Sequence, residues 1–313
     1  MTIVADTLTS HTAIGNREDL SDIIYDQSPT ETPFLSMLPR VKGTSSKHEW
    51  QTKALTAATS TNFKIEGDEA TNEAANLTTR LFNYRAISSK VSQVSGSQEA
   101  YNTAGRASEM AMQMEDDMLE LKRDVEKALM ENNAYVAGNT TLASECAGLQ
   151  AYVATNTNYS GTAPAGTGAD AHTDGTARPL QESFVESVLG LAWDNGGNPT
   201  KGFMGKFQKQ KFSTFSGSAT TMREQQTKKI VNTVDFYIDP LGTEIALVPC
   251  RQCPTDVVFF VDPSRVKFVT IRDFRTSDLA KTGDSVRKQT LVEYTLEVCN
   301  EKAHAGVYDL TTS

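Results

Sequence analysis

The sequence predicts an α+β fold in which one long helix precedes a strand-rich second half. Apolar residues recur at spacings of three and four between Ala104 and Ala128, which places them on one helical face. Short segments of alternating polarity follow from residue 202 onward, and residues 290–299 show this strand pattern best. Long tracts before the helix are poor in apolar residues, so we expect part of the chain to lie outside any core.

Composition excludes several functional classes. The 313 residues carry a formal net charge of -9, so the protein has no global attraction to DNA or to an anionic membrane. No apolar stretch approaches the ~20 residues of a membrane span, and residues 1–10 lack a signal-peptide pattern. Four cysteines are too few for a disulfide framework in a chain of this length. We therefore expect folding in a reducing cytoplasm.

Residues 1–45 are expected to form an extended N-terminal arm. A short amphipathic helix is predicted at residues 19–25, and the prolines between residues 29 and 39 favour extended backbone after it. The apolar side chains in that proline-rich stretch need burial, so we expect them to dock on a neighbouring subunit. The predicted contacts are Phe34, Leu35 and Leu38.

Residues 46–95 are expected to form an extended two-stranded loop. Strand-forming residues occupy 46–52 and 80–95, and an acidic tip lies at 67–73. An isolated two-stranded ribbon is marginally stable in water. The ribbon should therefore lie on another subunit, through Trp50, Phe63, Phe82 and Tyr84.

Residues 96–138 should contain the long helix, with Gly138 as its stop. The helix held within residues 97–137 could reach ~40–50 Å at ~1.5 Å per residue. A coiled coil is the alternative, although small Ala and flexible Met make a poor specific seam.

Residues 139–285 are expected to form one mixed domain. A low-complexity Thr/Ala/Gly-rich segment at 154–178 predicts a protrusion or a flexible insertion without a packed core. A second helix should follow Pro179, with Leu180, Phe184, Val188 and Leu191 on its apolar face. A strand at 230–239 should place Val234, Phe236 and Ile238 on one face.

Residues 286–313 should return to the first domain as a final strand. Its alternation predicts that Val292, Tyr294, Leu296 and Val298 face inward. Glu293, Thr295 and Glu297 should face outward.

Catalytic chemistry finds little support in the sequence. Cys250 and Cys253 have redox or zinc spacing, but no second Cys or His pair completes a tetrahedral site. Residues 166–171 mimic a dinucleotide fingerprint without the strand and helix that it requires. The four histidines are scattered, and the carboxylates are expected on solvated faces. We therefore predict no catalytic residue, no cofactor and no metal.

One basic–aromatic cluster stands out. Its lysines alternate with phenylalanines, a mixture that suits stacking on single-stranded nucleic acid. The lysines are Lys201, Lys206, Lys209 and Lys211. A half-buried element with a lysine-covered face is the simpler interpretation. A weak contact with DNA is compatible with both.

The order of these parts resembles the Hong Kong 97 type of tailed-phage capsid fold. That fold has an N-terminal arm, an extended loop, a spine helix, and peripheral and axial domains, and it closes on a long peripheral strand. Residues 28–35 (SPTETPFL), 126–129 (EKAL) and 295–304 (TLEVCNEKAH) resemble stretches of one large family of phage major capsid proteins.

The resemblance implies a virion subunit and no enzyme. Pentamers and hexamers of an icosahedral shell around double-stranded DNA are expected, formed around the axial domain. Because the sequence begins directly at the arm, a separate scaffolding protein is expected, together with a portal, a possible decoration or cement protein, and no membrane partner. The alternatives are a tail or decoration protein and an encapsulin-like compartment shell.

Overall fold

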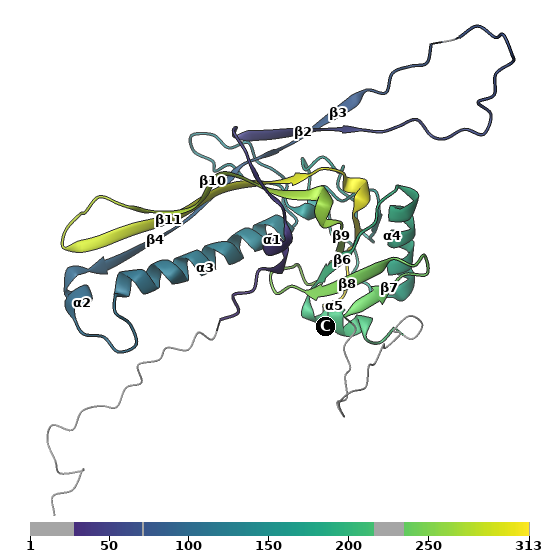
Figure 1. The fold of residues 1–313 in the computed structure, drawn as a ribbon. Helices are drawn as coiled ribbons and strands as arrows, with labels where there is room; N and C mark the ends of the chain where they lie inside the picture. Colours follow the sequence, from purple (N-terminus) through teal and green to yellow (C-terminus); the bar gives the residue numbers. More distant parts are fainter. Residues whose placement is uncertain (1–27, 71, 216–234, 313) are drawn as a thin grey trace, which may run out of the picture.

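The computed structural model describes residues 28–312, apart from residue 71 and residues 216–234. Two β-sheets form the body, and a two-stranded ribbon projects from it (Figure 1). The predicted helix at 19–25 lies outside the described residues. Within the described ranges, no helix is both long and apolar enough to cross a bilayer.

The first sheet has four strands in the order β1-β10-β11-β4. Strand β1 runs parallel to β10, and the other two pairs are antiparallel. The strands are β1 (Arg40–Lys42), β4 (Ala86–Ser95), β10 (Val266–Asp278) and β11 (Ser285–Val298).

The long helix α3 (Glu109–Met130) packs across β4 and β11. It buries Leu121, Val125 and Leu129 against this sheet. Its 22 residues span about 33 Å, so the expected length of ~40–50 Å was too great.

The start of α3 explains the error. The Ser108 side chain caps the helix by accepting a hydrogen bond from the Ala111 N–H. Gly105, at φ 78°, turns the chain before this cap. Helix α2 (Gly96–Ala100) is a separate short element. The expected stripe therefore fails at its first members, because Ala104 and Ala107 precede the helix.

The second sheet has six strands in the order β5-β12-β9-β6-β8-β7. Helices α4 (Glu182–Asp194) and α5 (Lys206–Phe212) and three 3-10 turns (Leu149–Ala151, Pro263–Arg265, Glu301–Ala303) complete this part of the body. The strands are β5 (Thr157–Asn158), β6 (Lys201–Met204), β7 (Phe236–Ile238), β8 (Glu244–Pro249), β9 (Val258–Val261) and β12 (Ala305–Val307).

Two predicted faces of this region need correction. Leu180 and Val188 are buried as predicted, but helix α4 also buries Val185 and Ala192, and the predicted Leu191 is exposed. Strand β7 buries Tyr237 and exposes Phe236 and Ile238, because Tyr237 faces the Phe212 ring of α5. Val234 lies outside the described residues.

The two sheets interleave along the chain. Strand β10 belongs to the four-stranded sheet although it lies within the expected 139–285 domain, so no sheet boundary falls at residue 285. Strand β12 returns to the six-stranded sheet, so residues 286–313 do not all stay in the four-stranded sheet, contrary to the expectation.

Residues 154–178 are packed against the body, contrary to the expectation of a segment without packing. Asp309 holds them, because its carboxylate accepts hydrogen bonds of 2.8–2.9 Å from the N–H groups of Ser160, Gly161 and Gly175. The Nε2 atom of His172 lies 3.0 Å from the same carboxylate. Burial alone would raise the pKa of Asp309, but these donors bring it well below the usual range.

The N-terminal segment from residue 28 to 45 is also part of the body. Its prolines do not prevent a short helix, α1 (Pro33–Met37), since Pro33 occupies the first helical position. Phe34, Leu35 and Leu38 are buried in the chain's own core. The expectation that these three side chains dock on a neighbouring subunit was therefore wrong.

Glu126 of α3 anchors this segment. It is fully buried, and its two carboxylate oxygens accept from the N–H groups of Phe34 (3.1 Å) and Leu35 (2.7 Å). The Cys250 thiol donates to it over 3.3 Å. Burial raises the pKa of Glu126 above its ordinary value of 4.5, and the backbone donors oppose that shift.

We expect Glu126→Gln to lower the free energy of unfolding at pH 7 by about 1–3 kcal/mol, because an amide nitrogen cannot accept a backbone N–H. The folded-state pKa is raised, so the native carboxyl contributes most stability below 4.5 and loses it as pH rises through the folded pKa. The gap between the two proteins should widen as pH falls from 7 toward 4.5 in urea titrations. The exposed Glu115→Gln is the control, and parallel pH profiles would contradict the role of Glu126.

Candidate functional site

The ribbon is the most unusual surface of the molecule. Strands β2 (Lys47–Lys53) and β3 (Thr78–Tyr84) pair antiparallel along their whole length. The connection between them, from residue 54 to 77, extends far from the body (Figure 1). Its large apolar side chains are 82–86% exposed: Leu55, Phe63, Ile65 and Leu77.

The same connection carries an acidic tip at Glu66, Asp68, Glu69 and Glu73. Four exposed apolar side chains in one projecting loop have no core of their own to enter. Exposed apolar surface of this kind marks an interaction site. The loop from 54 to 77 is therefore the candidate contact surface, and its partner must accept both apolar and negatively charged groups.

The aromatic residues at the ribbon's root pack within the chain. The Trp50 ring lies 5.8 Å from that of Tyr152, and Phe82 lies 4.9 Å from Tyr135. Tyr84 lies 5.4 Å from Tyr135. These side chains hold the ribbon on its own body, so they are not the free contacts that we expected. Of the seven predicted interface residues, Phe63 alone is largely exposed.

Two buried carboxylates of β11 form a charged socket for the root. Glu293 binds Arg85 and Arg272. Glu297 lies 2.8 Å from the Nε2 atom of His48 and accepts from the Lys267 ammonium over 2.9 Å. The expectation that Glu293, Thr295 and Glu297 face solvent was wrong: the hydroxyl of Thr295 donates to the Tyr84 carbonyl.

Hydrogen bonds from His48 and Lys267 lower the pKa of Glu297 to about 2, although burial opposes them. The Asn83 side chain adds neutral contacts, because its amide donates to the carbonyls of Leu296 and Ala147 and accepts from the Ala147 N–H. The ribbon's attachment thus combines aromatic packing with charged and neutral hydrogen bonds.

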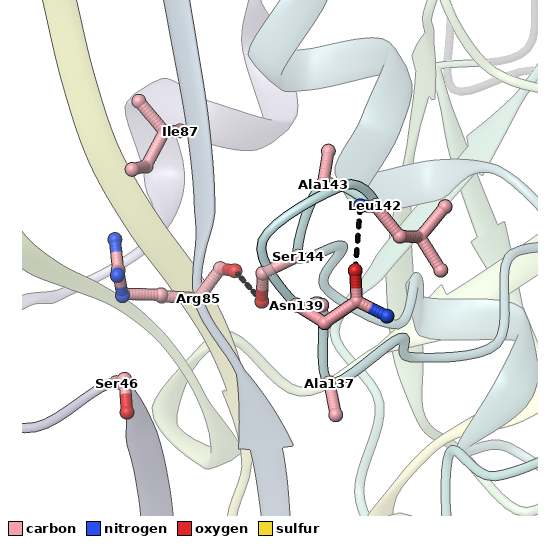
Figure 2. A pocket seen from close by; sticks show the side chains of 9 residues that line it. Ser46, Arg85, Ile87, Ala137, Asn139, Leu142, Ala143 and Ser144 are labelled. Atoms are coloured by element: carbon pink, nitrogen blue, oxygen red, sulfur yellow. Dashed lines mark hydrogen bonds between the residues drawn. The ribbon is translucent and has the colours of Figure 1, made fainter.

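A single residue, Arg85, separates strand β3 from strand β4. Beside it is an open pocket of about 420 Å³ whose walls include Ser46, Ile87 and the loop from 137 to 144 (Figure 2). The Ser144 hydroxyl donates to the Arg85 carbonyl over 2.7 Å, and the Asn139 side-chain oxygen accepts from the Leu142 N–H over 2.8 Å (Figure 2). This loop therefore supports the joint between ribbon and body.

The four predicted lysines do not form one patch. Lys201 lies on β6, and the Lys211 ammonium lies over the Phe207 ring. Lys206 and Lys209 instead line a cavity of about 480 Å³ together with Arg251. Burial lowers the pKa of Lys209, which donates to the Leu247 carbonyl over 2.8 Å.

The Cys250–Cys253 pair and the cluster around His172 serve packing. Cys250 and Cys253 are buried free thiols, and burial raises the pKa of Cys250 to about 12, so it is a poor nucleophile at neutral pH. His172, Asp174 and Asp309 come close enough to share a cation. Backbone N–H donors already occupy the Asp309 oxygens. We therefore interpret this cluster as a hydrogen-bonded anchor that holds residues 154–178 on the body.

The sequence analysis missed Glu126, Asp309 and Asn83. Each makes contacts across 64 to 213 residues, so no local pattern could reveal them. One signal was present: Glu126 adjoins Val125 on the buried side of the helical stripe, a position where a carboxylate is unusual.

Within the described residues, the projecting ribbon with its exposed apolar loop marks a contact surface of a structural protein. The family model described as SU10 major capsid protein matches residues 6–311. The chain belongs to this family and is accordingly the major capsid protein of a tailed phage.

Individual relatives agree. The chain is 25% identical to the major capsid protein of Escherichia phage Phieco32 over 315 residues, covering 86% of this chain and 87% of that protein. A structure described as the Cyanophage A-1(L) capsid asymmetric unit has a TM-score of 0.67 at 12% identity, covering 97% and 99% of the two chains. A structure from Microbacterium phage Oxtober96 has a TM-score of 0.60 at 13% identity, covering 94% of this chain and 95% of that chain. The expected Hong Kong 97-like α+β fold is confirmed.

We expect Glu297→Gln to lower the free energy of unfolding at pH 7 by about 1–3 kcal/mol. The folded pKa is depressed, so the carboxylate's contribution is present above 4.5 and is lost as pH falls through about 2. Urea titrations at pH 7 and pH 3 should show the deficit shrink at pH 3. Glu66→Gln at the exposed tip should leave stability unchanged, and a deficit independent of pH would argue against the ionic socket.

Proposed function

We propose that this capsid protein forms pentamers and hexamers of an icosahedral shell that encloses double-stranded DNA. The projecting ribbon carries the proposal, because its outer loop exposes four large apolar side chains that no part of the described chain covers. In a shell, a neighbouring subunit would cover them. Stable assemblies of this kind commonly bury more than ~2,000 Å² per interface.

The two sheets suggest a division of labour. The four-stranded sheet with α3 would form the peripheral domain, from which the ribbon reaches outward. The six-stranded sheet with α4 and α5 would form the axial domain around which the rings close. The exposed Phe236 and Ile238 of edge strand β7, with Trp193 of α4, give this domain apolar surface for such contacts.

Contact with DNA would be weak and independent of sequence. The net charge of -9 opposes tight binding, and the predicted lysines are divided between β6 and α5. Weak attraction suits a container, because strong binding would trap DNA on incomplete shells. The proposal includes no enzymatic activity and no membrane partner.

Assembly would take place in the host cytoplasm and would need other proteins. A shell built from both pentamers and hexamers requires control of curvature, which a separate scaffolding protein would supply. A portal would admit the DNA, and a decoration or cement protein would bind the outer surface. These partners are part of the proposal.

Negative-stain electron microscopy tests the proposal. The chain expressed with its neighbouring phage genes should give closed polyhedral shells or sheets of six-fold rings. Replacing Leu55, Phe63, Ile65 and Leu77 by Ser should leave a folded subunit with an unchanged melting temperature, because these side chains lie outside its core, but should abolish closed shells.

The matched control is a variant in which four alanines of the same loop are replaced by Ser, since it adds the same hydroxyls without removing large apolar groups. The four are Ala57, Ala58, Ala70 and Ala75. Normal shells from the first variant would overturn the proposed role of the ribbon. Monomers from the native chain under all conditions would overturn the assembly itself.

A further inference from the structure

The cavity between α5 and the connection from β8 to β9 has an unusual combination of properties. Its positive groups are Lys206, Lys209 and Arg251, in a protein whose net charge is negative. Pro249 and the buried thiols of Cys250 and Cys253 add apolar surface to its walls. A cavity with a cationic rim and apolar walls suits a partner that presents carboxylates beside apolar side chains.

The N-terminal segment of this chain passes the cavity. Glu31 is one of the residues that line it, and its carboxylate lies 3.9 Å from the Arg251 guanidinium. The described chain begins at Ser28, three residues earlier. Glu31, at the cavity, is therefore only three residues from the first described residue.

The sequence just before this point has the complementary chemistry. Residues 18–26 read Glu-Asp-Leu-Ser-Asp-Ile-Ile-Tyr-Asp, which combines four carboxylates with four large apolar side chains. The next residue along the chain that lines the cavity, Glu31, is five positions from Asp26. Five residues reach about 17 Å at most, which is enough to turn back into the cavity.

We propose that residues 18–26 dock into the cavity of their own chain, with apolar side chains against its walls and carboxylates at Lys206 and Arg251. The short tether favours the same chain over a second copy, because it holds the segment at an effective concentration of about millimolar. This inference concerns the isolated subunit and does not depend on shell formation.

Hydrogen exchange measured by mass spectrometry on the unassembled full-length subunit tests the proposal. In the native protein, amides of residues 18–26 should exchange roughly tenfold more slowly than in the double variant Lys206→Glu/Arg251→Glu, in which the charge of the rim is reversed. Lys281→Glu, an exposed lysine on the connection from β10 to β11, is the matched control and should leave exchange unchanged. Raising the salt concentration should weaken protection, because the rim contacts are ionic.

A second variant avoids changes in the folded body. Asp22→Lys/Asp26→Lys should remove the protection, and combining it with the reversed cavity should restore it. Equal exchange in the native and reversed-rim proteins would overturn the proposal. Protection that disappears on tenfold dilution would also overturn it, by showing that the segment of a second copy occupies the cavity.

Discussion

The buried carboxylate of Glu126 is the contact on which the body depends. It joins helix α1, helix α3 and the residue that follows β8, three elements distant in the sequence. No cation accompanies it among the hydrogen bonds and ion pairs of the described residues; its charge is balanced by two backbone N–H groups and a thiol. Such a carboxylate tolerates burial only while every donor stays in place, so it makes the N-terminal segment, the long helix and the second sheet one cooperative unit.

The ribbon is attached by a different physical device. Glu293 and Glu297 alternate with apolar residues on β11, where a solvated face would be ordinary. Arg85, Arg272, His48 and Lys267 cover this face, so the outer side of the sheet becomes a socket for the ribbon. Ionic contacts fix the direction and register of the ribbon better than apolar contacts do, because each charge has a required partner.

Local patterns in the sequence predicted the α+β class, the first ribbon strand and the presence of β11, since period-two and period-3.6 patterns mark strands and helices. The second predicted strand, 80–95, is instead divided at Arg85 into β3 of the ribbon and β4 of the four-stranded sheet. Local patterns failed where distant contacts decide. The apolar strip of Phe34, Leu35 and Leu38 looks free until Glu126 and the Phe203 ring are known to receive it. The segment from 154 to 178 looks unstructured because its anchor, Asp309, lies more than 130 residues away. For the candidate site, exposure of Phe63 was predictable from its place in a core-free loop, whereas the inward packing of Trp50, Phe82 and Tyr84 was not.

The near-continuous run of β3 into β4 has a mechanical consequence. Only Arg85 interrupts the strands from residue 78 to 95, and β4 pairs with β11 over ten consecutive residue pairs. A pull on the ribbon's tip along its axis would load those hydrogen bonds together, in shear, because ladder bonds lie perpendicular to the strands. Rupture would then require many bonds to fail at once rather than one after another. In the proposed shell, such a linkage would spread tension between neighbouring subunits over a whole sheet.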